Sequence, residues 1–155
     1  MIMKIKNILI LIFTMLVLIS CSGKNNENLV DDFLTTYFNQ ANYSETEWQK
    51  IEEIISSKDS HKVLEPFKEF LTDKALDKFV NSRVIPCFYL KDMNISYKIG
   101  SFEKSDDGLT VELVLNSNDK TISFPLKFQF KDGKINWFDY ATLMKNIQQL
   151  KKQSV

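Results

Sequence analysis

Apolar residues in the first half of the chain recur at helical spacing. Residues 29–38 carry them on one side, which predicts a helix with a single buried face. Ser44 and Glu47 then form the pattern of a capping box, in which each side chain bonds to the other residue's backbone N–H. We therefore expect a second helix to begin at Ser44, with Trp48 and the isoleucines that follow it on the inner face.

Two prolines and a threonine mark the boundaries of further helices. Pro66 is typical of the first turn of a helix, where its missing N–H is not needed, and it predicts a third helix with Phe67 and Leu71 inward. Thr72 is a suitable N-cap for a further helical turn. Pro86 is expected to end the helical region.

From about Tyr89 onward the period of the apolar residues changes to two. Three alternating runs have apolar side chains on one face and polar side chains on the other. These runs are Met93 to Ile99, Leu109 to Leu115 and Ile122 to Phe130, and residues 134–138 supply a fourth strand. The alternation predicts antiparallel strands with one face buried and one face in water.

Glycines that follow aspartates mark the turns between these strands. Asp107-Gly108 and Asp132-Gly133 are expected to form hairpin turns, because glycine tolerates positive φ. Pro125 cannot donate a hydrogen bond to a neighbouring strand. We therefore expect the third strand to lie at a sheet edge or to be bulged at this point.

The last segment of the chain returns to helical spacing. Asp139 can cap a helix there, with an apolar stripe from Tyr140 to Leu150. Helices followed by consecutive antiparallel strands predict an α+β architecture, with the helices packed on a four-stranded sheet. Residues 29–155 are long enough for one such domain with one core.

The N-terminus has the layout of a signal peptide. Lys4 and Lys6 form a short basic region, and residues 8–19 are apolar apart from Thr14. This apolar run is shorter than the roughly 20 residues that a transmembrane helix needs. A cleavable signal is therefore expected, with an uncleaved signal anchor as the alternative.

The N-terminal segment ends with Leu18-Ile19-Ser20-Cys21, and this sequence resembles the lipobox of bacterial lipoproteins. The resemblance implies removal of residues 1–20, cleavage between Ser20 and Cys21, and fatty acyl chains such as palmitate on Cys21. Each buried methylene contributes about 0.8 kcal/mol, so two or three chains anchor a protein stably. We expect a lipidated tether over residues 21–28 and a position on the extracytoplasmic face of the cell membrane.

The order of elements resembles that of the NTF2-like superfamily of cone-shaped domains. Two segments carry the resemblance: residues 67–76 are similar to the helix that closes the cone, and residues 132–137 to the last hairpin and strand. The C-terminal helix is a departure, because many members end at the last strand. It is expected either to block the mouth of the cone or to pack outside. A cystatin-like sheet wrapped on one helix is the alternative fold.

The charge balance argues against one class of partner. The chain has 20 basic and 20 acidic residues, and removing residues 1–20 takes away Lys4 and Lys6 and no acid. The remaining chain has 18 basic and 20 acidic residues, a balance of −2. Binding to nucleic acid needs a concentrated basic surface, so it is not expected.

The sequence contains few candidates for catalytic, metal-binding or ligand-binding residues. Cys87 has no intramolecular partner once Cys21 carries lipid, and His61 is the only histidine. Neither a metal site nor a cofactor is therefore predicted. The polar residues that a cone could recruit as a speculative pocket are Tyr89, Asp92, Tyr97 and Glu112. The inward strand positions are otherwise apolar and supply no general base, so no catalytic residue is predicted.

Three functions remain open after these exclusions. The first is a non-enzymatic binding or assembly module on the membrane, with an envelope protein as partner. The second is a pocket protein for an apolar small ligand or lipid, and the third is an immunity-type lipoprotein that intercepts a toxin. Trp48 and Trp137 are candidate interface anchors or, alternatively, partly buried core residues.

Overall fold

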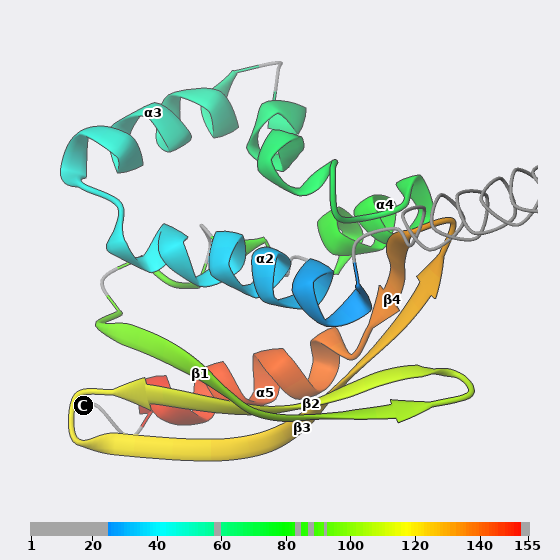
Figure 1. Ribbon diagram of the computed structural model, residues 1–155. Coiled ribbons are helices and arrows are strands. Elements are labelled where there is room, and N and C mark those ends of the chain that lie inside the picture. The colour runs from blue at the N-terminus through cyan, green and yellow to red at the C-terminus, as the bar shows by residue number, and fades with distance from the viewer. Residues whose placement is uncertain (1–24, 58–59, 83–84, 87–88, 92, 153–155) are drawn as a thin grey trace, which may run out of the picture.

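A computed structural model describes residues 25–57, 60–82, 85–86, 89–91 and 93–152. Its helical elements are α2 (Asn26–Asn39), η1 (Gln40–Asn42), α3 (Glu45–Ser56), η2 (Ser60–Phe67), α4 (Asp73–Asn81) and α5 (Tyr140–Lys152). Its strands are β1 (Ile95–Ser105), β2 (Gly108–Ser117), β3 (Lys120–Lys131) and β4 (Lys134–Phe138). The helices precede and follow one antiparallel sheet, as Figure 1 shows, which confirms the predicted α+β architecture.

Helix α2 lies across the sheet and buries one face, as its apolar spacing predicts. The Asn25 side chain caps it by accepting a hydrogen bond from the Glu27 backbone N–H at 3.4 Å. The buried residues are Leu29, Val30, Phe33, Leu34, Tyr37 and Phe38. This helix therefore forms the cover of the sheet's inner face (Figure 1).

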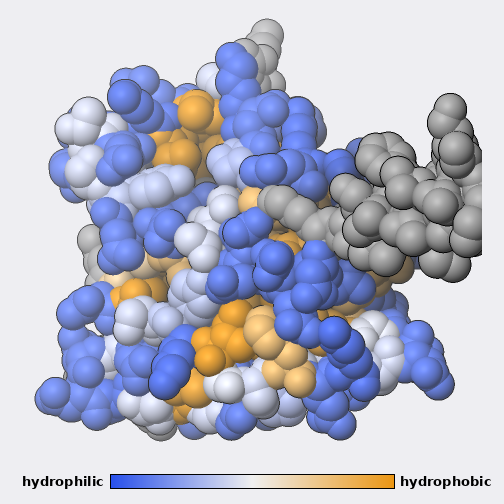
Figure 2. Space-filling model, in the orientation of Figure 1, coloured by the Kyte–Doolittle hydropathy of each residue, from blue (hydrophilic) through white to orange (hydrophobic). Residues whose placement is uncertain are grey.

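Helix α3 begins with the predicted capping box. The Glu47 carboxylate accepts hydrogen bonds from the Ser44 backbone N–H at 2.6 Å and from its hydroxyl at 2.7 Å. These bonds, the side-chain bond first, hold the pKa of Glu47 below its ordinary value. Trp48 is buried, whereas the isoleucines that share its face are only half-buried. Apolar side chains accordingly show at the surface near α3 in Figure 2.

The prediction of a helix that starts at Pro66 is wrong. Pro66 lies near the end of the 3-10 helix η2, and the next α-helix starts only after Thr72. Pro66 cannot donate a backbone hydrogen bond within η2, and the 3-10 helix ends one residue later, at Phe67. Phe67 and Leu71 are nevertheless buried as expected.

Helix α4 is capped by Thr72, as predicted, and ends at Asn81, before Pro86. The segment before it runs beside β4, where Thr72 N–H donates to the Ile135 carbonyl at 3.0 Å. Ile135 N–H donates in return to the Phe70 carbonyl at 2.8 Å. Through these two hydrogen bonds the segment before α4 pairs with the outer edge of β4.

The sheet has the order β1-β2-β3-β4, with three hairpin connections. Asp132 and Gly133 form the predicted two-residue turn, with φ of 53° and 74°. The turn predicted at Asp107-Gly108 is displaced by one residue, because Gly108 already pairs with Ser105 and the loop is Asp106-Asp107. Gly108 is required at the start of β2 because a Cβ there would lie 2.0 Å from the Phe128 carbonyl oxygen.

Pro125 lies where the third strand has one free side. Its pairing with Glu112 of β2 continues without a break, but β4 pairs only with residues 128–131. At Pro125 the strand is therefore locally at an edge, although β3 is internal in the strand order. The missing N–H consequently costs no ladder hydrogen bond on the β4 side.

The C-terminal helix α5 packs on the same side of the sheet as α2. Asp139 caps it by accepting from the Thr142 backbone N–H at 3.1 Å. The Tyr37 hydroxyl of α2 donates to the Met144 sulfur at 3.8 Å, and Leu143 is fully buried. The helix therefore fills space under α2, and the sheet carries more than the single helix of a cystatin-like fold.

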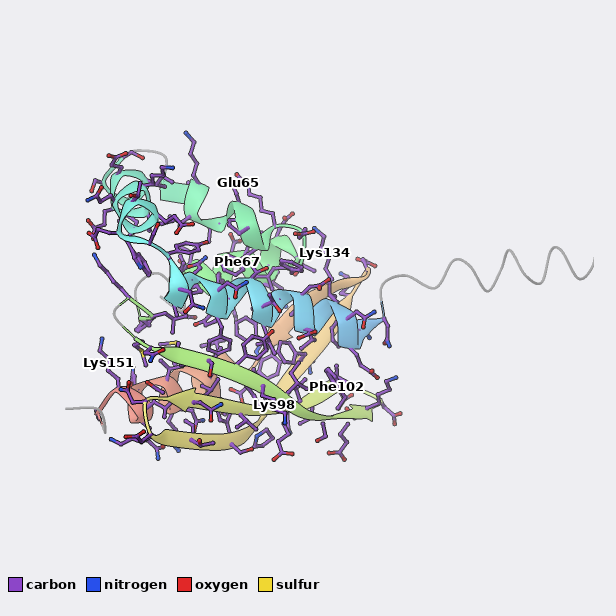
Figure 3. All side chains as sticks on the ribbon, turned by 60° about the vertical axis from the view of Figure 1, so that its left-hand side comes forward. Glu65, Phe67, Lys98, Phe102, Lys134 and Lys151 are labelled. Atoms are coloured by element: carbon purple, nitrogen blue, oxygen red, sulfur yellow. The ribbon has the colours of Figure 1, made fainter. Side chains whose placement is uncertain are left out.

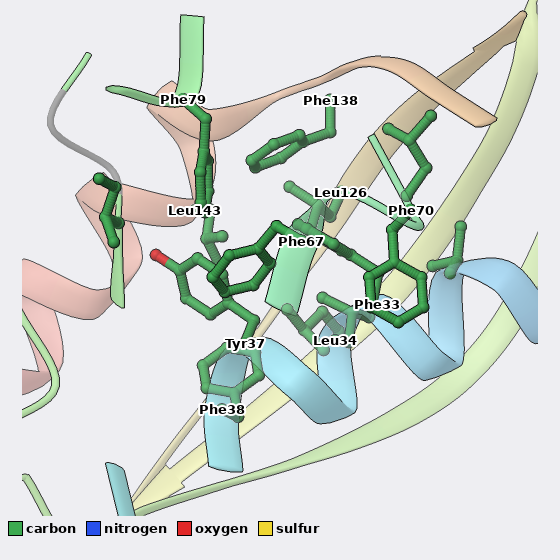
Figure 4. Close-up of a cluster of buried hydrophobic side chains, with 14 of the residues drawn as sticks. Phe33, Leu34, Tyr37, Phe38, Phe67, Phe70, Phe79, Leu126, Phe138 and Leu143 are labelled. Carbon is green, nitrogen blue, oxygen red and sulfur yellow. The ribbon is translucent and has the colours of Figure 1, made fainter. Parts of the chain in front are cut away.

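The interior is packed with aromatic rings. Figure 3 places Phe67 in the interior and Phe102 at the free edge of the sheet on β1. The Phe33 ring lies within 6.5 Å, between centroids, of six others, and the nearest is Phe138 at 5.2 Å. These rings meet side chains from α4, α5 and β3 in one cluster (Figure 4). The concave side of the sheet is therefore a filled core at this place.

Candidate functional site

The polar residues predicted as a pocket are not brought together. Tyr97 lies on the inner side of β1, where it is half-buried and stacks on Phe38 at 5.1 Å. Glu112 points from the opposite face of the sheet into solvent and accepts a hydrogen bond from Ser123 at 2.9 Å. Tyr89 is half-buried against the core, and Asp92 lies outside the described residues.

Tyr97 makes a small polar contact with α2. Its hydroxyl bonds to the Thr35 hydroxyl and donates to the Asp31 carboxylate at 3.2 Å. Burial raises the pKa of Tyr97 above its ordinary value, and the negative charge of Asp31 adds to the rise, whereas the Thr35 bond opposes it. This contact joins α2 to β1 at the surface.

The remaining candidates for catalysis or metal binding are the histidine and the two cysteines. His61 is exposed on η2. Cys87, like Cys21 and the whole of residues 1–24, lies outside the described residues. Within the described ranges no three His, Cys, Asp or Glu side chains are grouped so that they could hold a metal ion. In the same ranges no helix has the length and apolar character needed to span a membrane.

Trp137 is an aromatic residue that faces outward beside a hollow. Strand alternation predicts that Trp137 shares the buried face of Ile135, two residues before it. The register shifts in between, because Phe130 pairs with Ile135 but Gln129 pairs with Trp137. Asn136 is the extra residue of this bulge, and it turns Trp137 to the outer face.

A side chain from the neighbouring segment holds the bulge. The Thr72 hydroxyl donates to Asn136 Oδ1 at 3.2 Å, so the same threonine that caps α4 fixes the extra residue of β4. Trp137 is half-buried, and it lines a narrow hollow together with Ala75, Lys78 and Phe79 of α4. Trp48, by contrast, is 5% exposed and belongs to the core.

Two further hollows are lined by Trp137, and we call these two together the Trp137 trough. The larger has a volume of about 600 Å³ and crosses the outer face of the sheet. The smaller, of about 170 Å³, lies between β4 and α4. The side chains that line one or both include Lys74, Lys78, Glu103, Asp107, Thr110, Pro125, Lys127, Gln129, Asn136 and Trp137. A hollow of this size is in the range of ligand sites, although it is open to solvent.

The charges in the trough are separated along its length. Lys74 and Lys78 lie four residues apart on one face of α4, and Lys127 lies on β3. Within the described part of the chain none of these lysines has an ion pair or a side-chain hydrogen bond. Glu103 and Asp107 lie at the other end, beside the β1–β2 hairpin. The trough is therefore positive around Trp137 and negative at the hairpin.

Comparison with known proteins assigns no family to the chain. No model of a known protein family matches the chain, and no curated protein matches it. Among solved structures, a de novo designed NTF2 fold protein, NT-9, is 15% identical and superposes with a TM-score of 0.38. The match covers 64% of this chain and 88% of the designed one. An overlap of that extent assigns no family, so the α+β architecture rests on the sheet order and the helix positions above.

Proposed function

We propose that this protein is a non-enzymatic binding module, anchored by lipid on Cys21 to the extracytoplasmic face of the cell membrane. Its contact surface in this proposal is the Trp137 trough. The observation that carries the proposal is an outward-turned tryptophan with three lysines that have no partner in the described chain. Aromatic anchors of this kind dominate the binding energy of many protein interfaces.

The packing of the interior supports an external rather than an internal ligand site. Phe33, Phe67 and Phe79 are at most 1% exposed and contact one another edge-on. An apolar ligand would have to displace rings that already fill the space. The alternative of a lipid pocket inside the cone therefore receives no support from this region.

The candidate acid and base side chains lie on different elements of the fold, which supports binding rather than catalysis. General acid–base catalysis needs groups within about 3 Å of the same reacting atoms. Tyr97 and Glu112 are on opposite faces of the sheet, and His61 is on η2. The trough itself has lysines, acids and amides on an open surface, which suits recognition.

The short distance along the chain from Cys21 to Asn25, the N-cap of α2, supports contact with a partner close to the membrane. Four peptide units separate Cys21 from Asn25, which limits the distance between their Cα atoms to about 14 Å. Asn25 and Asn26 share a hollow with Lys104 to Leu109 of the β1–β2 hairpin. The negative end of the trough is at the same hairpin, so a lipid on Cys21 would hold the trough near the membrane surface.

Cross-linking in intact cells tests this proposal. The tagged wild-type protein and a Cys21→Ala variant would be expressed at equal levels, cross-linked, purified and analysed by mass spectrometry. We expect the wild type in the membrane fraction with one stoichiometric envelope partner. The variant should leave the membrane fraction and lose most of that partner. A wild type that turns over a substrate, or that co-purifies with a lipid and no protein, contradicts the proposal.

A further inference from the structure

The outer row of the sheet sets the length of the chain that the trough can hold. Glu103 of β1 pairs with Thr110 of β2, and Thr110 pairs with Lys127 of β3. Trp137 of β4 pairs with Gln129, two residues farther along β3 than Lys127. Three gaps between strands of about 4.8 Å each and an offset of about 7 Å along β3 place Trp137 about 16 Å from Glu103. About five residues of an extended polypeptide span the same distance, at about 3.4 Å per residue.

The shape of this surface favours an inserted chain over a flat lipid surface. Pro125, Thr110 and Trp137 all line the larger hollow, so a partner that lies in it contacts the indole. A bilayer surface contacts residues that protrude, whereas an extended segment can lie along a depression. Gln129 and the NH₂ group of Asn136, whose Oδ1 is held by Thr72, offer hydrogen bonds to peptide groups.

The separated charges select the composition of the segment. Around Trp137, Lys74, Lys78 and Lys127, which have no partner among the described residues, attract carboxylates. At the hairpin end, Glu103 and Asp107 repel carboxylates and attract a basic side chain. Apolar contact with Trp137 favours an aliphatic residue between them.

We infer that the Trp137 trough binds an extended polypeptide segment of an envelope protein that is acidic at the Trp137 end and basic at the hairpin end. The inference rests on the proposed function and names the chemistry of the partner. The segment crosses the strands of the sheet and does not extend it, because the trough runs along the row from Glu103 to Trp137.

Fluorine NMR on the full-length lipoprotein in nanodiscs tests the inference. The chain has two tryptophans, so 5-fluorotryptophan labelling gives two resonances, which a Trp137→Phe variant assigns. The probe is a capped hexapeptide, Glu-Glu-Ile-Thr-Lys-Lys, and its matched control has glutamine at all four charged positions. We expect a saturable, salt-sensitive shift of the Trp137 signal with the probe and none with the control. The buried Trp48 signal should stay fixed and reports that the domain is folded.

Two sets of lysine variants complete the test. Replacing Lys74, Lys78 and Lys127 by glutamine should weaken binding about fivefold, the sum expected for the exposed charge pairs of the probe's two carboxylates. Replacing three exposed lysines elsewhere, Lys98, Lys145 and Lys151, should leave it unchanged; Figure 3 shows Lys98 on β1 and Lys151 at the end of α5.

Several results would overturn the inference. They are an equal response to the glutamine peptide, no response at all, or equal weakening by both sets of variants. A Trp137 shift caused by phosphatidylglycerol in the nanodisc without peptide would assign the trough to lipid and also overturn it. If the peptide fails while the cross-linked envelope partner persists in cells, the inference is wrong and the proposed function stands.

Discussion

Replacing Phe33 by alanine removes the ring at the centre of the core. Phe33 is fully buried, and its ring contacts Tyr37, Phe67, Phe70, Phe79, Phe128 and Phe138. These partners come from α2, η2, the turn after it, α4, β3 and β4, so they cannot all move into the space that is left.

The expected cost follows from burial and packing together. A buried Phe→Ala substitution lowers the free energy of unfolding by roughly 3–5 kcal/mol, because both transfer energy and packing contacts are lost. A domain of this size is stable by about 5–15 kcal/mol, so the substitution removes a large fraction of that. With a urea m-value of about 2 kcal/mol/M, the midpoint should fall by about 2 M.

The measurement is the unfolding of residues 22–155 in urea, monitored by circular dichroism. This segment contains every buried apolar residue that the structure describes, from Leu29 to Leu150. Phe102→Ala is the matched control, because Phe102 is only half-buried at the free edge of β1. The control should cost about 1 kcal/mol or less. If Phe33→Ala cost no more than the control, the interior would not be packed as described, and a ligand cavity would become the better account.

Three further predictions concern single positions. Gly108→Ala should destabilise the domain more than Gly133→Ala in the same urea assay, because a Cβ at Gly108 meets the Phe128 carbonyl and one at Gly133 meets nothing within 4 Å; equal effects would contradict the clash. Gln40→Met should leave stability unchanged or raise it by about 1 kcal/mol, because Gln40 is 2% exposed and its Oε1 has no hydrogen-bond partner among the residues that the structure describes; a large loss would mean that this oxygen is satisfied. Because the folded-state pKa of Tyr97 is raised, its contribution to stability is complete below the ordinary tyrosine pKa of about 10 and is lost as pH rises through the folded value. The urea midpoint of the wild type should therefore fall more than that of Tyr97→Phe between about pH 8 and about pH 11, and parallel curves would refute the shift.

The helices and strands were largely predictable, because burial on one face imposes its period on the sequence. The apolar stripe of α2, the capping box at Ser44 and the alternation in β3 each specify a local structure. The α-helix predicted to start at Pro66 was wrong because the sequence alone does not distinguish a proline near the end of a 3-10 helix from one in the first turn of an α-helix. The order of elements expected from the NTF2-like resemblance, helices followed by a four-stranded antiparallel sheet, is confirmed.

The trough was not predictable in the same way. Trp137 stands two residues after the buried Ile135, so strict alternation places it in the core. A bulge reverses that direction, and the hydrogen bond that holds it joins Thr72 to a residue 64 positions later. The lysines of the trough likewise come from α4 and β3, which only the tertiary fold brings together. The position of α5 beside α2 depends on the same long-range packing, so the sequence left it open.

Photo-cross-linking from within the trough tests the central claim most directly. A p-benzoylphenylalanine residue in place of Gln129, which is exposed and lines both hollows, would be compared in intact cells with the same residue in place of Glu53 on the exposed side of α3. The account predicts one envelope protein cross-linked from position 129, lost when Trp137→Ala is added, and none from position 53. A partner captured equally from both positions, or one from position 129 that persists without the Trp137 side chain, would contradict it.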